Sequence, residues 1–293
     1  MIRKRFSIGK ALIYLMVTML CASIVIAFWH LLNLSLSPSH IATRGGLLLY
    51  PKEPTLDNYG RVIGNRYIWM GYKNTLIRTA IGTVLQLFIT SMGAYVLSKR
   101  YFPHRTFWTL FIVFTMFFSG GLIPNYLLVK NLGLLNTYAS MILPGLISAY
   151  NTVIIRNYFQ SLPEEIEESC LIDGAGRFRI FLQFVLPLSK PILATVALWL
   201  AVGHWNSWFD VLIYISDDTK FTLQIVLRRI ILTGSKEILD TSAAANSAEM
   251  ESVVSSEGLK AACIFVTTFP ILCAYPFVQK FFVKGIMIGS LKG

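Results

Sequence analysis

The sequence predicts an all-α, polytopic membrane protein with six transmembrane helices. Of its 293 residues, 55% are hydrophobic and only 14% are charged, and the mean hydropathy is +0.60. Apolar runs of about twenty residues, long enough to cross a bilayer, recur along the chain. The formal net charge of +11 fits a positive cytoplasmic face. No arginine–aromatic recognition module accompanies that charge, so we expect membrane lipid and no nucleic acid as a partner.

Motifs of catalysis and metal binding are missing from the sequence. The four cysteines form no CxxC pair and the four histidines are scattered, so neither a disulfide framework nor a metal site is expected. There is no GxxxxGK[ST], HExxH or GxSxG pattern. We therefore expect a non-catalytic membrane subunit that binds no cofactor itself.

The first predicted span is residues 11–34, which follow a basic stretch at 1–10. Its apolar core is too long for a signal peptide, so it is interpreted as a membrane helix with its amino terminus inside. Residues 35–73 then form an external segment rich in proline and aromatic residues. This segment either faces a soluble partner or forms an interfacial aromatic belt.

The other predicted spans are 74–97, 107–129, 138–155, 191–214 and 259–283. Gly120-Gly121 and Pro124 interrupt the third span of the six. With six spans, the basic residues at the amino terminus and within 99–105, 156–190 and 280–292 fall on one side, which the positive-inside rule assigns to the cytoplasm. Both termini are then cytoplasmic, and 215–258 is the longest external polar region.

The segment 161–191 is the main polar interruption between spans, and its local chemistry predicts two short helices with a sharp turn between them. Ser161 and Glu164 form a predicted capping box around Pro163 in the first turn. Gly174 ends the first helix because glycine adopts the left-handed conformation needed there. We expect Leu186-Pro187 to break the second helix.

The sequence also predicts one apolar face on each of the two short helices in 161–191. In the first helix, Leu162, Ile166 and Cys170 share one face. In the second helix, one side is apolar and the arginines Arg177 and Arg179 lie off it; its members are Phe178, Phe181, Leu182 and Val185.

This segment resembles the cytoplasmic EAA loop of bacterial ABC importer permeases, roughly E-A-A-x-x-x-G followed by I-x-L-P. The matching residues are Glu168, Ser169, Cys170, Gly174, Phe184, Leu186 and Pro187. Ser169 and Cys170 replace the two alanines, and Phe184 replaces the isoleucine. The longer string IDGAGRFRIFLQFVLPLSKP is similar to the carbohydrate-importer branch, the relatives of the maltose permeases. The alternative is an amphipathic loop with no partner.

The resemblance implies a type I ABC importer permease fold. It implies an N-terminal helix and external segment at 1–73, and a permease core at 74–293 that carries the loop. The implied partners are a second homologous permease, two ATPase subunits that hold ATP and Mg²⁺, and an extracytoplasmic solute-binding protein. The residues expected to couple ATPase motion to transport are Glu167, Glu168, Asp173, Gly174, Arg177 and Pro187.

The fifth predicted span carries polar and aromatic residues in its outer half, namely His204, Trp205, Asn206, Trp208 and Asp210. Polar groups inside a membrane usually face a bundle interior or a water-filled cavity, and aromatic rings beside hydrogen-bonding groups suit a sugar. These residues are candidates for the substrate path. An outer aromatic belt with Asp210 reaching the interface is the alternative.

The carboxyl-terminal string PFVQKFFVKGIMIGSLKG resembles the family's tail, which in maltose-type permeases reaches into the ATPase dimer. The matching positions are Lys284, Gly285, Gly289, Lys292 and Gly293. A basic tail near anionic lipid is the alternative.

The resemblance thus predicts a permease subunit of an ATP-driven oligosaccharide importer in the bacterial inner membrane. Acidic fragments of the alginate or uronate type are the expected cargo, by likeness to the smaller permease subunit of alginate importers. A self-sufficient secondary sugar transporter is the alternative, and it would need intramembrane ion-coupling residues such as Arg78 and Asp210. A structural or signalling membrane protein would leave the EAA-like loop unexplained.

Overall fold

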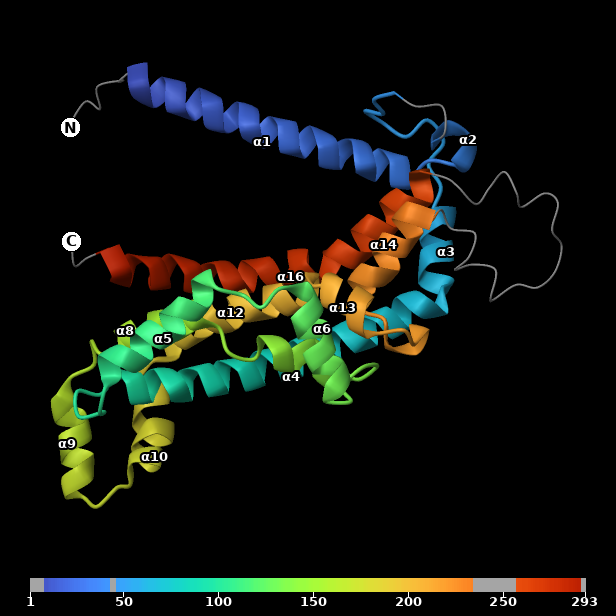
Figure 1. Ribbon diagram of the computed structural model, residues 1–293. Helices are drawn as coiled ribbons and strands as arrows, with labels where there is room; N and C mark the ends of the chain where they lie inside the picture. Colours follow the sequence, from blue (N-terminus) through green and yellow to red (C-terminus); the bar gives the residue numbers. More distant parts are fainter. Residues whose placement is uncertain (1–7, 43–45, 234–256, 291–293) are drawn as a thin grey trace. The chain divides into compact units, whose positions relative to one another are not determined.

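The computed structural model describes residues 8–42, 46–233 and 257–290, and within these ranges it contains helices and connecting turns but no β-strand (Figure 1). The chain divides into two compact units. The first unit is Met1–Ile68 with Leu227–Pro270, and the second is Trp69–Val226 with Ile271–Gly293. The expected all-helical architecture is therefore confirmed for the described residues.

The first unit is held together by polar contacts near the carboxyl end of its first helix. Its helices are α1 (Ile8–Ser35), α2 (Ser39–Ala42), α3 (Asp57–Gly64) and the start of α16 (Glu257–Ser290). The Asn58 side chain donates to the Ser35 and Ser37 carbonyls, at 3.0 and 2.9 Å. A Cβ on Gly258 would lie only 2.8 Å from Asn58 Nδ2. The absence of a side chain at Gly258 therefore lets α16 approach this corner closely.

Helix α1 is apolar on all sides and is not covered by the described part of the chain. Its stretch Leu12–Ser35 has a mean hydropathy of 2.3 in its most apolar window, none of which is buried. A helix that is hydrophobic around its whole circumference needs an apolar environment. Lipid provides that environment, in agreement with the first predicted span.

The second unit contains the long helix α4 (Arg66–Ser98) and a series of shorter helices. These are α5 (Arg105–Phe117), α6 (Leu122–Asn131), α7 (Tyr138–Ile142), the 3-10 turn η1 (Leu143–Gly145), α8 (Ala149–Phe159), α9 (Glu164–Ile172), α10 (Arg177–Ile180), the π-helical turn η2 (Phe181–Val185), α11 (Leu186–Leu188), α12 (Lys190–Asn206), α13 (Phe209–Tyr214), the 3-10 turn η3 (Asp218–Lys220) and the start of α14 (Leu223–Thr233).

Two described helices, α1 and α4, are long and apolar enough to cross a membrane alone, and three bent helix pairs raise the possible number to five. The bends are 111° between α5 and α6, 56° between the α7–η1 and α8 helices, and 84° between the α10–α11 run and α12. The first bend lies at the predicted glycine interruption, where Gly121 has φ +85°. The sixth predicted span, 259–283, falls within α16.

The fifth predicted span is not the single helix that its hydropathy suggests. Helix α12 ends at Asn206, Ser207 is extended, and α13 starts only at Phe209. The expectation of one continuous helix over 191–214 is therefore wrong. The Ser207 hydroxyl donates to Asp210 Oδ1 at 2.7 Å, which links the break to the first turn of α13.

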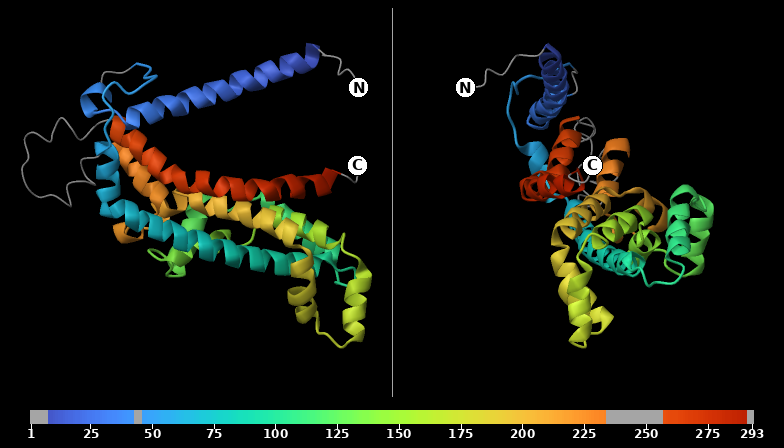
Figure 2. Two further views of the ribbon diagram at one scale, coloured as in Figure 1. Left: turned by 180° about the vertical axis from the view of Figure 1, so that it is seen from behind. Right: turned by 90° about the vertical axis from the view of Figure 1, so that its left-hand side faces the viewer.

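The apolar core of the second unit ties α9 and α10 to the long helices. Its buried members are Ala94, Tyr95, Ile155, Phe159, Cys170, Ile180, Phe181, Val185, Val196 and Leu200. The Phe181 ring centroid lies 5.2 Å from that of Tyr95, which lies 6.4 Å from that of Phe159. Helices α9 and α10 are anchored by this core and project from one end of α4 and α8 as a hairpin (Figures 1 and 2).

Candidate functional site

The α9–α10 hairpin contains most of the segment 161–191, and its first helix starts without the predicted capping box. Helix α9 begins at Glu164, after Pro163, which offers no side-chain acceptor. Ser161 instead donates its hydroxyl to the Tyr158 carbonyl at 2.7 Å, so it closes the end of α8. The predicted Ser161 cap is therefore wrong. Three acids in the first turn, Glu164, Glu165 and Glu167, still favour this helix end through the helix dipole.

The carboxyl end of α9 is closed by a Schellman motif, as the glycine predicted. Gly174 has φ +76°. Its N–H donates to the Leu171 carbonyl at 3.0 Å, and the Ala175 N–H donates to the Cys170 carbonyl at 2.9 Å. Gly174 is therefore confirmed as the residue that ends α9 and turns the chain toward α10.

The second arm of the hairpin buries two of the four predicted apolar residues. Ile180, Phe181 and Val185 are 1–2% exposed, whereas Phe178 is 59% exposed and Leu182 is 39% exposed. Phe178 still lies beside Phe181, with ring centroids 6.3 Å apart. The π-helical turn at Phe181–Val185, in which the Leu186 N–H donates to the Phe181 carbonyl, changes the helical period beyond Phe181.

The second arm ends at Ser189, two residues after the predicted break at Leu186-Pro187. Pro187 lies inside helix α11, while Ser189 leaves the helical conformation and the axis turns by 84°. Pro191 has no N–H to donate to the Pro187 carbonyl, so the hydrogen bond that would span Ser189 is missing. The next proline, rather than Pro187, therefore accounts for the position of the break.

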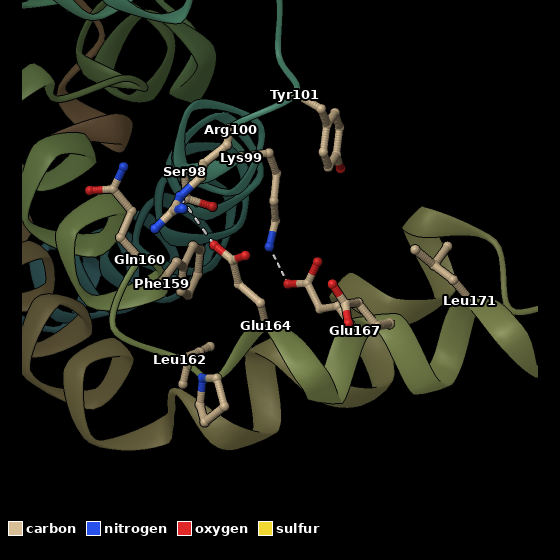
Figure 3. A pocket seen from close by; sticks show the side chains of 12 residues that line it. Ser98, Lys99, Arg100, Tyr101, Phe159, Gln160, Leu162, Glu164, Glu167 and Leu171 are labelled. Carbon is tan, nitrogen blue, oxygen red and sulfur yellow. Dashed lines mark hydrogen bonds and ion pairs between the residues drawn. The ribbon is translucent and has the colours of Figure 1, made fainter.

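A set of charged contacts fastens the hairpin to the end of α4 (Figure 3). Lys99 forms an ion pair with Glu167, and the Tyr95 hydroxyl donates to the same carboxylate at 3.4 Å. The Lys99 ammonium also lies 4.5 Å from the centroid of the Tyr95 ring. On the other arm, the Arg177 guanidinium stacks 3.9 Å above the Tyr101 ring. Of these residues, Lys99, Tyr101 and Glu167 border a pocket of about 200 Å³ between α4 and α9.

A second ion pair beside this pocket is far more exposed. Arg100 Nε lies 3.3 Å from Glu164 Oε1, and the two side chains are 83% and 66% exposed. The side chains of Lys99 and Glu167 are only 14% and 18% exposed. Exposed pairs contribute little because water and salt screen them, so Lys99–Glu167 is the pair that fixes geometry.

The rest of the predicted coupling set lies on the outer surface of the hairpin. Glu168, Asp173, Gly174 and Pro187 are all exposed. Close to them, the apolar side chains of Leu171 and Ile172 are also exposed, by 46% and 86%. The predicted set is thus divided: Glu167 and Arg177 contact the chain's own residues, and the other four face outward.

At the opposite end of α4, Asp210 belongs to a network within the chain. Its carboxylate pairs with Arg78, which is 2% exposed, and accepts from the Ser207 hydroxyl and the Val211 N–H. Arg78 also donates to the Met141 carbonyl at 3.3 Å. The network connects α4, α7 and α13, so the oxygens of Asp210 already have partners.

His204 occupies a different polar cluster, between α4, α12 and η1. Its Nε2 lies 3.1 Å from Gln86 Oε1, and Gln86 donates to the Gly145 carbonyl at 2.6 Å. A Cβ on Gly82 would lie 2.6 Å from the same histidine nitrogen. The ring of His204 is therefore packed directly against the backbone of α4.

The three remaining substrate-path candidates point to separate surroundings. Trp205 is 8% exposed and lies edge-on to Tyr72, and its Nε1 has no hydrogen-bond partner within the described ranges. Asn206 is exposed and donates to the Val202 carbonyl. Trp208 is half-buried against Phe209. The structure thus places the five candidates in one region around the α12–α13 break, with His204, Trp205 and Asp210 in different sets of contacts.

Beyond α13, asparagines hold the connection to α14. Asn136 Oδ1 accepts from the Ser216 and Asp217 N–H groups, and Asn74 donates to the Thr219 carbonyl. Hydrogen bonds from the Thr219 hydroxyl and the Lys220 ammonium lower the pKa of Asp217 to about 2. This connection is therefore ordered and carries a carboxylate that stays ionised.

Sequence reasoning missed the contacts of α4 that organise both ends of the unit. Asn74, Arg78, Gly82 and Gln86 recur every four residues and so lie on one helix face. Between them they contact α7, η1, α12, α13 and η3, which makes this face the scaffold for those elements. A polar or glycine residue every fourth position within an apolar span is the signal that could have revealed it.

The predicted tail residues are only partly described. Lys284 and Gly289 fall within α16, and Lys292 and Gly293 lie outside the described residues. Among the described residues, no group of three His, Cys, Asp or Glu side chains could hold a metal ion.

Comparisons with known proteins agree on one kind of protein. The family described as "Binding-protein-dependent transport system inner membrane component" matches residues 68–286. Protein LplC of Bacillus subtilis (strain 168) is 42% identical over 270 residues, which cover 92% of this chain and 90% of that protein. The polygalacturonan/rhamnogalacturonan transport system permease protein YtcP of the same organism is 38% identical over 282 residues, covering 96% and 97%.

A solved structure is similar over almost the whole chain. It is described as the crystal structure of a bacterial ABC transporter involved in the import of the acidic polysaccharide alginate. The matched chain has a TM-score of 0.83 and 29% sequence identity, and the match covers 94% of this chain and 99% of that one.

Proposed function

The chain belongs to the family of binding-protein-dependent transport system inner membrane components, and on that premise we propose that it is one of two permease subunits of an ATP-driven oligosaccharide importer. It is a multi-pass, non-catalytic permease of an ABC transporter, a family whose ATP is hydrolysed by partner ATPases. Family membership also implies a solute-binding protein as a partner. The proposal adds a second homologous permease and two ATPase copies.

The observation that carries this proposal is the α9–α10 hairpin. It projects from one end of the long helices, and it exposes Glu168, Asp173 and the apolar side chain of Ile172. Leu171 and Phe178 of the hairpin are exposed as well, and exposed apolar surface rimmed by polar residues marks protein-interaction sites. We assign this surface to an ATPase subunit, with Gly174 setting the turn between the arms and Pro187 lying in the second arm.

The proposed topology has six spans and two cytoplasmic termini in a type I importer fold. The first span and external segment are residues 1–73, and the permease core is 74–293. Lys284, Gly289, Lys292 and Gly293 would bring the carboxyl-terminal tail to the ATPase dimer. In this topology the hairpin lies in the cytoplasm, which is where ATP is bound with Mg²⁺ by the partner subunits.

The proposed transport cycle begins when ATP binding closes the two ATPase subunits on the hairpin. Because the hairpin is attached to α4 and α8 through a shared apolar core, its displacement moves those helices together. The two permeases then rock and open the cavity between them to the solute-binding protein. ATP hydrolysis returns the subunits and releases the sugar inward.

The proposed cargo is an oligosaccharide, and acidic fragments of the uronate type are the finer proposal. YtcP is named for polygalacturonan and rhamnogalacturonan, and the similar solved transporter is described as importing alginate. We place the substrate path at the α12–α13 break, with Trp205 and Trp208 for stacking and His204 and Asn206 for hydroxyl groups. Asp210 would act there by holding the break in place through Arg78.

The test is ATPase activity of the purified complex in nanodiscs, measured with the binding protein and a panel of neutral and acidic oligosaccharides. We expect stimulation by acidic fragments. Stimulation by neutral sugars alone would support an oligosaccharide importer and contradict the proposal that its cargo is a uronate fragment. Purification of a chain that transports sugar without any ATPase would overturn the proposal in favour of a secondary transporter.

A further inference from the structure

We propose that Lys99 and Tyr95 are positioning residues that hold Glu167 and thereby transmit movement of the α9–α10 hairpin to α4. This inference rests on the proposed function, in which the hairpin receives the motion of the ATPase. It concerns residues at the end of α4 that lie outside the 161–191 segment. We name the three side chains, Lys99, Tyr95 and Glu167, the α4 clamp.

The α4 clamp is a largely buried ionic contact with a fixed geometry. Glu167 receives the Lys99 ammonium on one carboxylate oxygen and the Tyr95 hydroxyl on the other. Tyr95 is 6% exposed and packs on Phe159 and Phe181 of the apolar core. Tyr95 therefore has little freedom to move, and it supports both members of the Lys99–Glu167 ion pair.

The position of Lys99 makes the contact mechanically relevant. Lys99 immediately follows Ser98, the last residue of α4, and Glu167 lies in the first turn of α9. Apolar packing resists separation of the two helices but is non-directional. An ion pair with hydrogen-bond geometry adds resistance to sliding and rotation. The clamp is thus the part of the attachment that can fix the angle between α9 and α4.

The other arm of the hairpin contacts the same short stretch of chain. Arg177, the first residue of α10, stacks on Tyr101, two residues after Lys99. Both arms are consequently held by residues 99–101, which follow α4. A displacement of either arm of the hairpin can therefore move the end of α4. Among the described contacts of the two arms with residues 99–101, the largely buried ion pair is the one from α9.

The test uses the complete complex, reconstituted with the second permease, the ATPases and the binding protein in liposomes. The measured quantity is sugar imported per ATP hydrolysed. The principal variant is the double substitution Lys99→Met/Glu167→Gln, which removes both charges and leaves neither buried without a partner. We expect this ratio to fall at least about fivefold, the low end of typical coupling free energies, while ATP hydrolysis continues.

Two further variants separate positioning from loss of folding. The charge exchange Lys99→Glu/Glu167→Lys should restore part of the ratio, because the pair is re-formed with opposite polarity. The exposed pair provides the matched control: Arg100→Ala/Glu164→Gln should change the ratio by less than about twofold. Each complex is first checked for subunit stoichiometry, and Tyr95→Phe, which removes only the hydroxyl, tests the third member without altering the core.

The outcomes distinguish this inference from the proposed function. If the wild-type complex couples import to ATP hydrolysis and the neutral double variant couples equally well, the clamp has no positioning role and the proposed function stands. If the wild-type complex hydrolyses no ATP and imports no sugar, the proposed function fails and the clamp's role fails with it. A double variant that does not assemble, together with Tyr95→Phe that couples normally, would also overturn the inference.

Discussion

Two phenylalanines on the second arm of the hairpin, three residues apart, should affect different properties of the protein when each is replaced by alanine. Phe181 is 1% exposed, and its ring centroid lies 5.2 to 6.3 Å from those of three other rings, Tyr95, Phe88 and Phe178. Phe178 is 59% exposed. We predict that Phe181→Ala lowers the stability of the chain and that Phe178→Ala mainly weakens binding of the partner ATPase.

The magnitudes follow from burial. A buried phenylalanine shortened to alanine costs about 3–5 kcal/mol, including the cavity that it leaves. For a chain of this size that corresponds to a fall of roughly 6–20 °C in the unfolding midpoint. Phe178 has less than half of its surface to lose, so its stability cost is about 1 kcal/mol. The two variants should therefore differ by several degrees in the same measurement.

The assay is the fraction of monodisperse protein that remains after heating, read by fluorescence-detected size exclusion of the purified subunit. A second measurement, retention of the ATPase subunits during purification, should be reduced for Phe178→Ala under conditions in which the subunit itself is folded. Equal thermal shifts for the two variants would refute the assignment of buried and exposed faces. Full ATPase retention with Phe178→Ala would remove Phe178 from the docking surface.

Three further predictions concern α4 and the turn of the hairpin. Gly174→Ala should reduce stimulated ATPase activity and cost about 1–2 kcal/mol, because alanine is strained at positive φ. Gly174→Asn should retain most of that activity, since asparagine tolerates this conformation and no atom lies within 4 Å of a Cβ there. Gly82→Val should reduce folded yield in the same heating assay, because its Cβ would overlap the His204 ring; unchanged yield would contradict the close approach. Arg78→Ala should destabilise the chain by about 3–5 kcal/mol by leaving Asp210 without its partner, and Arg78→Ala/Asp210→Asn should recover part of that loss in unfolding measurements.

Features that depend on nearby residues could be predicted from the sequence. Gly174 was identified correctly because the left-handed turn after a helix needs only local chemistry. The first two spans followed from hydropathy. The same local reasoning failed at Ser161, which bonds back to α8, and it gave no sign of the π-turn at Phe181–Val185.

Features that depend on distant residues could not be predicted in this way. Glu167 is separated from Lys99 by 68 positions, and nothing in the pattern of the 161–191 segment indicates that its acid pairs within the chain. The same holds for Asp210 and Arg78, 132 positions apart. Charge and amphipathicity indicate that a group needs a partner, whereas only the tertiary arrangement identifies the partner.

The π-helical turn at Phe181–Val185 also gives the hairpin's second arm one residue in reserve. A turn of this kind holds one residue more than an α-helical turn would. Deleting one residue from it should therefore convert it into an ordinary α-helical turn and keep the rotational phase of α10, with Ile180 and Phe181 in the core and Arg177 against the ring of Tyr101. The same deletion within regular α-helix has no such reserve and turns the two sides by about 100° relative to one another. The second arm should therefore tolerate loss of the exposed Gln183 better than α9 tolerates loss of any one of its residues.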